Sequence, residues 1–261
     1  MHRVATALIA CAAFSIGLSQ AASAAPVAAP WSWTGFYVGG NAGYAWGRAD
    51  TTTDIPGANI FVPSPADALI FSDAASPTFN SKGFTGGVQL GFNYQVSNFV
   101  FGLETDYNAF RLRGSTDTVG VPVASLTTLT SHTEVNTDWL FTLRPRAGIT
   151  FGQWLFYGSG GLAMTNIKYS QSNVFSPGCG PFSCTESVES SKTKTGWAAG
   201  GGVEAALFDN WSVKGEYLYV DFGSIGTTTG FDNVFSTPIT HDAKLRASIA
   251  HLGLNYRFGG P

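Results

Sequence analysis

The sequence predicts an all-β fold, an eight-stranded antiparallel up-and-down transmembrane β-barrel with long extracellular loops and short periplasmic turns. Three observations lead to this prediction. Apolar and polar residues alternate over eight stretches, long and short connections alternate between them, and aromatic residues recur at their ends. Only 12% of the 261 residues are charged, about half the fraction of an ordinary soluble domain.

Residues 1–24 have the features of a cleaved signal peptide. Arg3 supplies a basic start, residues 4–18 are apolar, and Ala22-Ser23-Ala24 is a small-residue cleavage pattern. We expect cleavage between Ala24 and Ala25, so the chain is exported. A retained helical anchor is a weaker interpretation, because no charges follow that would stop transfer.

A lipoprotein signal ending at Cys11 is a second alternative, which the seven further residues of the apolar run disfavour. Residues 25–33 are interpreted as a short Pro/Ala-rich lead-in, and residues 34–261 as the barrel domain. Export leaves Cys179 and Cys184 in a Gly/Pro-rich segment. In an oxidising compartment this pair predicts a disulfide, whereas half a metal site would need a nearby His or another Cys pair. We therefore predict no metal site and no cofactor.

The first four stretches alternate with a period of two residues, as a strand between two environments does. Residues 34–49 set aromatic side chains against Gly and Asn, and residues 83–95 set them against Thr, Gln and Asn. Residues 99–110 carry acidic side chains on the polar parity, whereas residues 138–151 carry arginines there. Most stretches exceed the roughly 9 to 11 residues that a tilted strand needs to cross a membrane.

The last four stretches are less regular. Residues 154–169 are rich in Gly and leave the phase of the alternation open. Residues 195–207 alternate cleanly, whereas Leu218 and Val220 interrupt the polar side of the next stretch. This seventh stretch covers residues 211–220, and the eighth covers residues 244–258.

The connections alternate in length. Long, polar ones cover residues 50–82, 113–137, 170–194 and 222–243, and we expect mobility there. Tight turns occur at residues 96–98, 152–153 and 208–210. Short turns on one side and long loops on the other are typical of outer-membrane barrels.

Aromatic residues on the apolar parity predict two interfacial girdles. They are Phe36, Trp46, Trp139, Trp154, Trp197, Trp211 and Phe258. With the apolar parity facing lipid, the charged parity faces the lumen, where a barrel of about eight strands is just wide enough for side chains to fill. On the lipid face a Lys or Arg at the membrane midplane would cost about 2 to 4 kcal/mol.

Counting residues along the strands from the short turns places eight charged residues of the lumen parity at similar heights, with the last one slightly lower. They are Glu104, Asp106, Arg144, Arg146, Glu204, Lys214, Glu216 and Arg257. Four cations therefore face four anions, and buried charges are admissible if they pair. The sequence predicts a balanced ionic plug rather than an open channel.

Three stretches carry a family resemblance: WTGFYVGGNAGYAWG (33–47), GLETDYN (102–108) and GWAAGGGVEAALFDNWSVKGEYLYVDFG (196–223). They resemble the small outer-membrane immunogenic proteins of alphaproteobacteria, porin-family surface antigens with an OmpA-like eight-strand barrel. The closing HLGLNYRF (251–258) resembles the signal read by the barrel-assembly machinery, although Gly259, Gly260 and Pro261 follow the terminal Phe.

The resemblance implies an integral barrel in the outer membrane of a Gram-negative bacterium, in contact with outer-membrane lipid and lipopolysaccharide, with antigenic outer loops. A structural and surface-antigen role is the first hypothesis. The alternatives are binding of haem or a host surface by the outer loops, and a narrow small-solute pore. The net charge of −3 gives no indication of a nucleic-acid partner.

The catalytic candidates are weak. Ser131-His132 and His241-Asp242 lie in different predicted loops, and neighbours in sequence do not make a triad. We therefore predict no enzyme and interpret them as solvated loop residues. Haem binding through His132 or His241 stays an alternative, whereas His251, on the lumen parity, is expected to be structural.

Overall fold

The computed structural model describes residues 31–54, 65–124, 127–176, 185–231 and 235–258. All of them lie in the compact unit Trp31–Pro261. The predicted cleavage site, the Cys179–Cys184 pair and residues 259–261 lie outside the described residues. Among the residues that are described, no helix is long and apolar enough to span a membrane.

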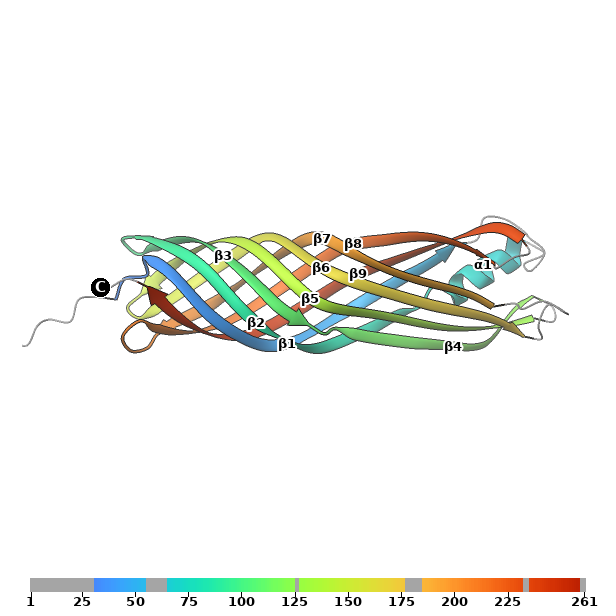
Figure 1. Ribbon diagram of the computed structural model, residues 1–261, viewed down its shortest axis with the longest axis horizontal. Helices are drawn as coiled ribbons and strands as arrows, with labels where there is room; N and C mark the ends of the chain where they lie inside the picture. The colour runs from blue at the N-terminus through green and yellow to red at the C-terminus, as the bar shows by residue number, and fades with distance from the viewer. Residues whose placement is uncertain (1–30, 55–64, 125–126, 177–184, 232–234, 259–261) are drawn as a thin grey trace, which may run out of the picture. The chain divides into compact units, whose positions relative to one another are not determined.

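Eight antiparallel strands form a closed ring (Figure 1). Each pairs with the next, and the last pairs with the first. The strands are β1 (Gly35–Asp54), β2 (Thr78–Val96), β3 (Phe99–Phe110), β5 (Thr127–Phe151), β6 (Trp154–Ser176), β7 (Thr185–Ala206), β8 (Trp211–Phe231) and β9 (Phe235–Phe258). This ring confirms the predicted fold class.

Two further elements lie outside the simple ring. Strand β4 (Arg113–Ala124) follows β3 after a two-residue break and pairs with the outer part of β5. Helix α1 (Pro65–Ala74) lies between β1 and β2 in the sequence and among the far ends of the strands in Figure 1. The sequence did not predict this helix.

The three tight turns are where the sequence places them. Ser97, Gly152 and Asp209 adopt positive φ angles of 56°, 59° and 50°, the left-handed conformation that closes tight hairpins. All three turns lie at the end where β9 finishes (Figure 1). We call this end of the ring the turn end and the opposite end the distal end.

The structure corrects the extent of the predicted loops. Apart from β3, with 12 residues, the ring strands are 19 to 25 residues long. Most of the predicted loop 113–137 is therefore strand, in β4 and the start of β5. The predicted loop 50–82 contains the end of β1, α1 and the start of β2. These segments looked like loops because they are polar and rich in Thr, but Thr also favours strands.

In the half nearest the turn end, the outward side chains are apolar and most of the inward ones are polar. Phe36, Val88 and Leu254 are exposed, whereas Gln89 and Asn255 are buried inside. The phase of β6, which the sequence leaves open, places Trp154 and Phe156 outward and Leu155 and Tyr157 inward.

In the distal half the same parities change character. The interior becomes apolar and includes Phe110, Leu140, Leu218 and Ile249, while the outer face carries charged residues such as Lys168. Leu218 and Val220, which interrupt the polar pattern in the sequence, belong to this interior. An apolar section of the interior thus follows the polar section that contains Gln89 and Asn255.

Candidate functional site

Seven of the eight predicted lumen charges meet in one buried cluster. We call this cluster the ionic layer, and it contains Glu104, Asp106, Arg144, Arg146, Glu204, Lys214 and Glu216. Residues two apart on a strand point to the same face, so each strand contributes its charges inward. The strand register then sets Glu104 opposite Arg144 and Glu204 opposite Lys214.

Arg144 joins three carboxylates at the centre of the layer. Its Nη2 donates to Glu104 Oε1 at 2.9 Å and to Asp106 Oδ2 at 2.7 Å, and its Nη1 donates to Glu216 Oε1 at 2.9 Å. The planar guanidinium can hold several acceptors at once, which a lysine ammonium does less well. Arg144 therefore connects β5 to both β3 and β8.

Lys214 extends the layer, with Nζ 2.8 Å from Glu104 Oε1 and 3.7 Å from Glu216 Oε2. Arg146 contacts Glu104 Oε2 at 3.4 Å and Glu204 Oε2 at 3.2 Å. The layer thus contains three cations and four carboxylates in contact with one another.

Two tyrosines complete the layer. The guanidinium of Arg146 lies 4.9 Å from the ring centroids of both Tyr37 and Tyr157, close enough for cation–π attraction. The hydroxyl of Tyr37 donates to Glu104 Oε2 at 2.7 Å, and that of Tyr157 donates to Glu216 Oε1 at 3.2 Å.

The sequence analysis missed both tyrosines because it counted aromatic residues as lipid-facing. Tyr37 lies on the inward parity beside Asn41, which was an available signal. Glycines make room for the rings: a Cβ added at Gly91 would collide with the Tyr37 ring, and one at Gly202 would lie 2.8 Å from the Tyr157 hydroxyl oxygen.

Arg257 is the exception among the eight predicted charges. It lies at the turn end, where Nη1 donates to the Thr34 carbonyl at 3.2 Å and Nη2 to Asn210 Oδ1 at 3.4 Å. Its guanidinium is 4.8 Å from the ring centroid of Trp31. Within the described residues it makes no ion pair, so the predicted four-to-four balance does not hold inside the contacting cluster.

The predicted girdle residues form two groups on the outer face. Near the turn end are Phe36, Trp154, Trp211 and Phe258, with Phe36 against Phe92 at 4.7 Å and Trp211 against Tyr256 at 5.2 Å between ring centroids. Higher up, Trp46 is 6.1 Å from Tyr217, Trp197 is 5.5 Å from Tyr219, and Trp139 is 6.1 Å from Tyr107. We call the second group the upper girdle.

About ten residues of strand separate the two groups. At about 3.3 Å per residue and a tilt of about 40°, this spans roughly 25 Å, the height of the apolar band of an outer-membrane barrel. The outward side chains between the groups are apolar, as described above. The distal half therefore extends beyond the band that matches a membrane.

The two candidate catalytic pairs do not converge, because neighbouring residues of a strand face opposite sides. Ser131 is buried inside the ring, whereas His132 is exposed and lies 2.6 Å from Asp117 on β4. His241 is buried, with Asp242 on the opposite face. Neither pair has the nucleophile–base contact that acyl transfer requires.

His241 belongs to a second polar cluster inside the distal half. Its Nε2 lies 3.1 Å from Glu186 Oε1, and its Nδ1 lies 3.2 Å from both Thr53 Oγ1 and Gln171 Oε1. Thr53 and Gln171 also donate to the Ala75 carbonyl, just after α1, at 2.8 Å and 3.1 Å. This cluster therefore attaches the end of α1 to the inside of the ring. His251 is buried on the lumen side opposite Glu216.

Comparison with known proteins agrees with this architecture. A family model described as outer membrane protein beta-barrel domain matches residues 10–258. The 31 kDa outer-membrane immunogenic protein of Brucella melitensis is 34% identical over 261 residues, which cover 97% of this chain and 96% of the relative. A 22 kDa outer membrane protein of Rhizobium leguminosarum is 29% identical over 203 residues, covering 78% and 71%.

Among solved structures, the outer membrane protein OprG of Pseudomonas aeruginosa matches with a TM-score of 0.45 and 13% identity, over 87% of this chain and 97% of OprG. The family model and the Brucella relative each cover nearly the whole chain. The chain therefore belongs to the outer membrane protein β-barrel domain family and is a protein of the Gram-negative outer membrane.

Proposed function

We propose that this barrel is a structural and surface-displayed protein with a closed lumen and no catalytic activity. One observation carries the proposal: every residue of the ionic layer is only 0 to 5% exposed. A conducting path would leave water against at least one face of these charged groups. Instead, their oxygens and nitrogens, apart from Asp106 Oδ1, contact one another and neighbouring polar side chains.

The apolar interior of the distal half provides a second seal. On the inward parity of β5, β8 and β9, the next residues toward the distal end are Leu140, Leu218 and Ile249, and all three are buried. They lie two residues from Thr142, Glu216 and His251, respectively. A hydrated ion would lose its water shell against such a layer without gaining any ligands. Two different barriers therefore lie in series along the lumen.

We further propose that the turn end faces the periplasm and the distal end faces the outside of the cell. The Brucella relatives are named as immunogenic, and the distal half, beyond the upper girdle, is the part that would be displayed. The apolar band would contact outer-membrane lipid and lipopolysaccharide, and the last strand would be recognised by the barrel-assembly machinery.

Haem binding through His241, one of the two candidate ligands, has less support. Both ring nitrogens of buried His241 already lie close to side chains of the polar cluster. Haem ligation would have to break these contacts inside the ring. His132 is exposed on the outer face, where no second His of the described residues is paired with it.

Planar-bilayer recording of the refolded protein tests the closed lumen. We expect no steady conductance steps from the wild-type protein. The variant Arg144→Ala/Lys214→Ala hollows the ionic layer and leaves the apolar layer intact, so it should also stay closed. Reproducible steps from the wild-type protein would refute the proposal and favour the pore.

A further inference from the structure

A pocket of about 290 Å³ lies on the outer face where the wall of the barrel is locally irregular. Pairing of β3 with β5 ends at Ala109 opposite Trp139, and β4 resumes it only at Arg113 opposite Asn136. A register shift in β5 between Thr137 and Leu140 coincides with this break. The interrupted strand and the shifted one together leave the pocket.

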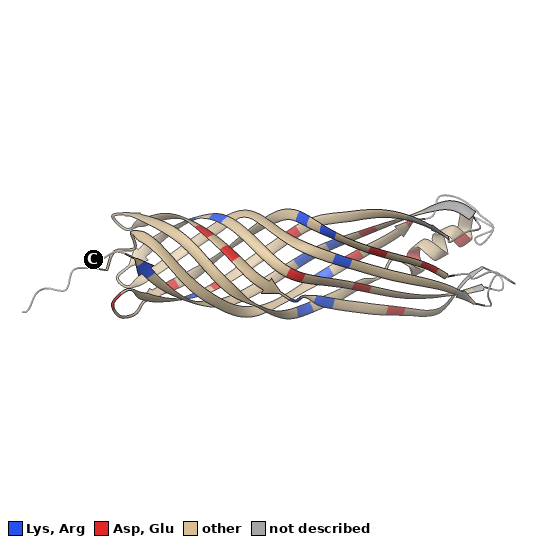
Figure 2. Cartoon of the chain, viewed as in Figure 1, with Lys and Arg blue, Asp and Glu red and all other residues tan. Residues whose placement is uncertain are grey.

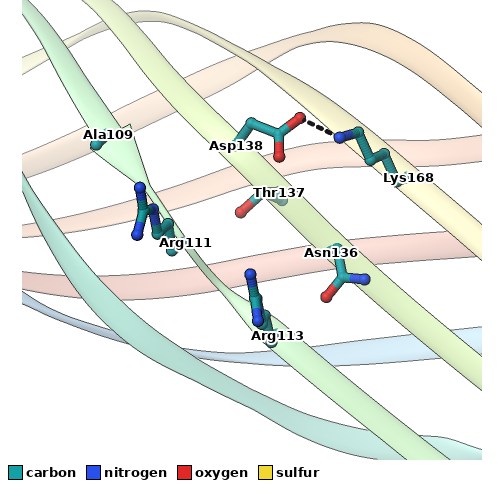
Figure 3. Close-up of a pocket in the computed structure, with 7 residues that line it drawn as sticks. All are labelled: Ala109, Arg111, Arg113, Asn136, Thr137, Asp138 and Lys168. Atoms are coloured by element: carbon teal, nitrogen blue, oxygen red, sulfur yellow. Dashed lines mark ion pairs between the residues drawn. The ribbon is translucent and has the colours of Figure 1, made fainter.

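The pocket is basic. Arg111 and Arg113 lie on one side of it, and Asp138 and Lys168 lie on the other (Figure 3). Lys168 Nζ is 2.7 Å from Asp138 Oδ2. The two arginines are exposed and make no side-chain ion pair or hydrogen bond within the described residues. Three cations and one carboxylate therefore surround a space that an anion can enter.

The height of the pocket relative to the membrane band is well defined. Trp139, which stacks with Tyr107 in the upper girdle, directly follows Asp138 at the pocket wall. Interfacial aromatic residues mark the level of the lipid headgroups. The pocket is thus at the outer headgroup level, with apolar surface directly below it.

Other cations lie at the same level of the outer face, among carboxylates such as Asp50 and Asp221 that pair with some of them. Apart from Arg3, which is outside the described residues, every Lys and Arg that does not point into the lumen lies at or above the upper girdle. Figure 2 shows a band of Lys and Arg segments around the middle of the strands, with Asp and Glu segments in the same region. Lys82 is directly opposite Arg113 across the strands, which raises the positive potential beside the pocket.

We propose that this pocket binds a phosphate group of a phosphorylated glycolipid in the outer leaflet. Arginine guanidinium groups match phosphate oxygens with paired hydrogen bonds, and Arg111 and Arg113 supply two such groups whose hydrogen-bond donors have no side-chain acceptor within the described residues. A lipid is favoured over free phosphate because acyl chains below the headgroup would pack on the surface around Trp139 and Tyr107. The inference rests on the proposed orientation of the barrel, with the distal end outside the cell, but not on whether the lumen is closed.

Binding of lipid A to the refolded full-length barrel in a zwitterionic detergent tests the proposal, with native mass spectrometry as the readout. Bis-phosphorylated lipid A should bind, and phosphatidylcholine should bind far more weakly. Arg111→Gln/Arg113→Gln should weaken lipid A binding by at least about tenfold, because it removes charge-assisted hydrogen bonds. Asp138→Asn should strengthen binding, since it removes the carboxylate that lines the pocket.

The matched control is Arg48→Gln/Arg246→Gln. These arginines lie in the same band, but each already contacts a carboxylate, Arg48 that of Asp50 at 2.9 Å and Arg246 that of Asp221 at 3.3 Å. Their loss should change binding by less than about twofold. In every variant the unboiled protein should migrate differently from the boiled protein on denaturing gels, as in the wild-type protein. This shows that each variant folds.

Three outcomes would overturn the proposal. Unchanged binding by Arg111→Gln/Arg113→Gln would show that the pocket is not used. An equal loss in the control pair would show general attraction to the basic band rather than a site. Displacement of lipid A by inorganic phosphate at the same concentration would show an ion site that does not recognise a lipid.

Discussion

Removing one cation from the ionic layer should destabilise the barrel strongly. Lys214→Ala leaves two cations beside four buried carboxylates, and Glu104 loses its 2.8 Å contact with Lys214 Nζ. Arg144→Ala has a larger effect on the contacts, because three carboxylates lose a partner at once. Both changes leave negative charge in an interior with little water.

The magnitude follows from the burial of these groups. Breaking a buried ion pair from one side costs about 3 to 5 kcal/mol, and we expect Lys214→Ala within that range and Arg144→Ala at its upper end or beyond. Lys214→Met/Glu216→Leu removes one charge of each sign and should be more stable than Lys214→Ala. Asp106→Asn removes one of the excess negative charges, and its oxygen can still accept from Arg144 and Thr142, so it should cost less than about 1 kcal/mol.

The assay is urea unfolding of the refolded barrel in lipid vesicles, followed by tryptophan fluorescence, with comparison of midpoints and slopes. Lys244→Ala, on the outer face of the distal half, is the control and should leave the midpoint unchanged. Unchanged midpoints for both Lys214→Ala and Arg144→Ala would refute the reasoning, because the layer would then be hydrated. A cost for Asp106→Asn equal to that of Lys214→Ala would show that the layer has no excess of negative charge.

Three other expectations concern the barrel as a whole. The unboiled protein should migrate differently from the boiled protein on denaturing gels, since a closed ring has no free strand edge from which to unfold; identical migration would contradict closure. In a background without cysteines, Asp117→Cys should be labelled from outside intact cells and Asp209→Cys should be protected, and the reverse pattern would invert the topology. Gly91→Ala should lower the unfolding free energy by about 1 to 3 kcal/mol through overpacking against the Tyr37 ring. Gly120→Ala is the control, because an added Cβ there meets open space and only the strain of the positive φ is expected. Equal urea midpoints for the wild-type protein and Gly91→Ala would exclude the close packing.

The sequence predicts the strands near the turn end well because each of their faces meets one kind of environment. A period of two then identifies the face directly, and Glu104, Arg144 and Lys214 all point inward as expected. It predicts the distal half less well, because the outer face there meets water and the composition becomes similar to that of a loop. Strand pairing beyond the membrane depends on partners far along the chain, such as β4 with β5, and no local pattern specifies them.

The errors at individual lumen residues have similarly specific causes. Arg257 was counted with the ionic layer from its distance along the strand, but it is one residue from the end of β9 and contacts Thr34 and Asn210 at the turn end. Tyr37 and Tyr157 were missed because a tyrosine is amphipathic and suits both lipid and a charged interior. Distances between strands, rather than alternation along one strand, decide both cases.

The apolar interior of the distal half has a consequence for recognition by antibodies. Because residues such as Phe222, Leu245 and Ile249 form a packed core there, the part of the barrel beyond the membrane presents a stiff, corrugated sheet. Residues that are neighbours on this surface come from different strands, as Arg246 and Asp221 do. Epitopes on this surface are discontinuous in sequence. Antibodies raised against the folded protein would therefore not bind the boiled protein, and short synthetic peptides would reproduce the epitopes poorly.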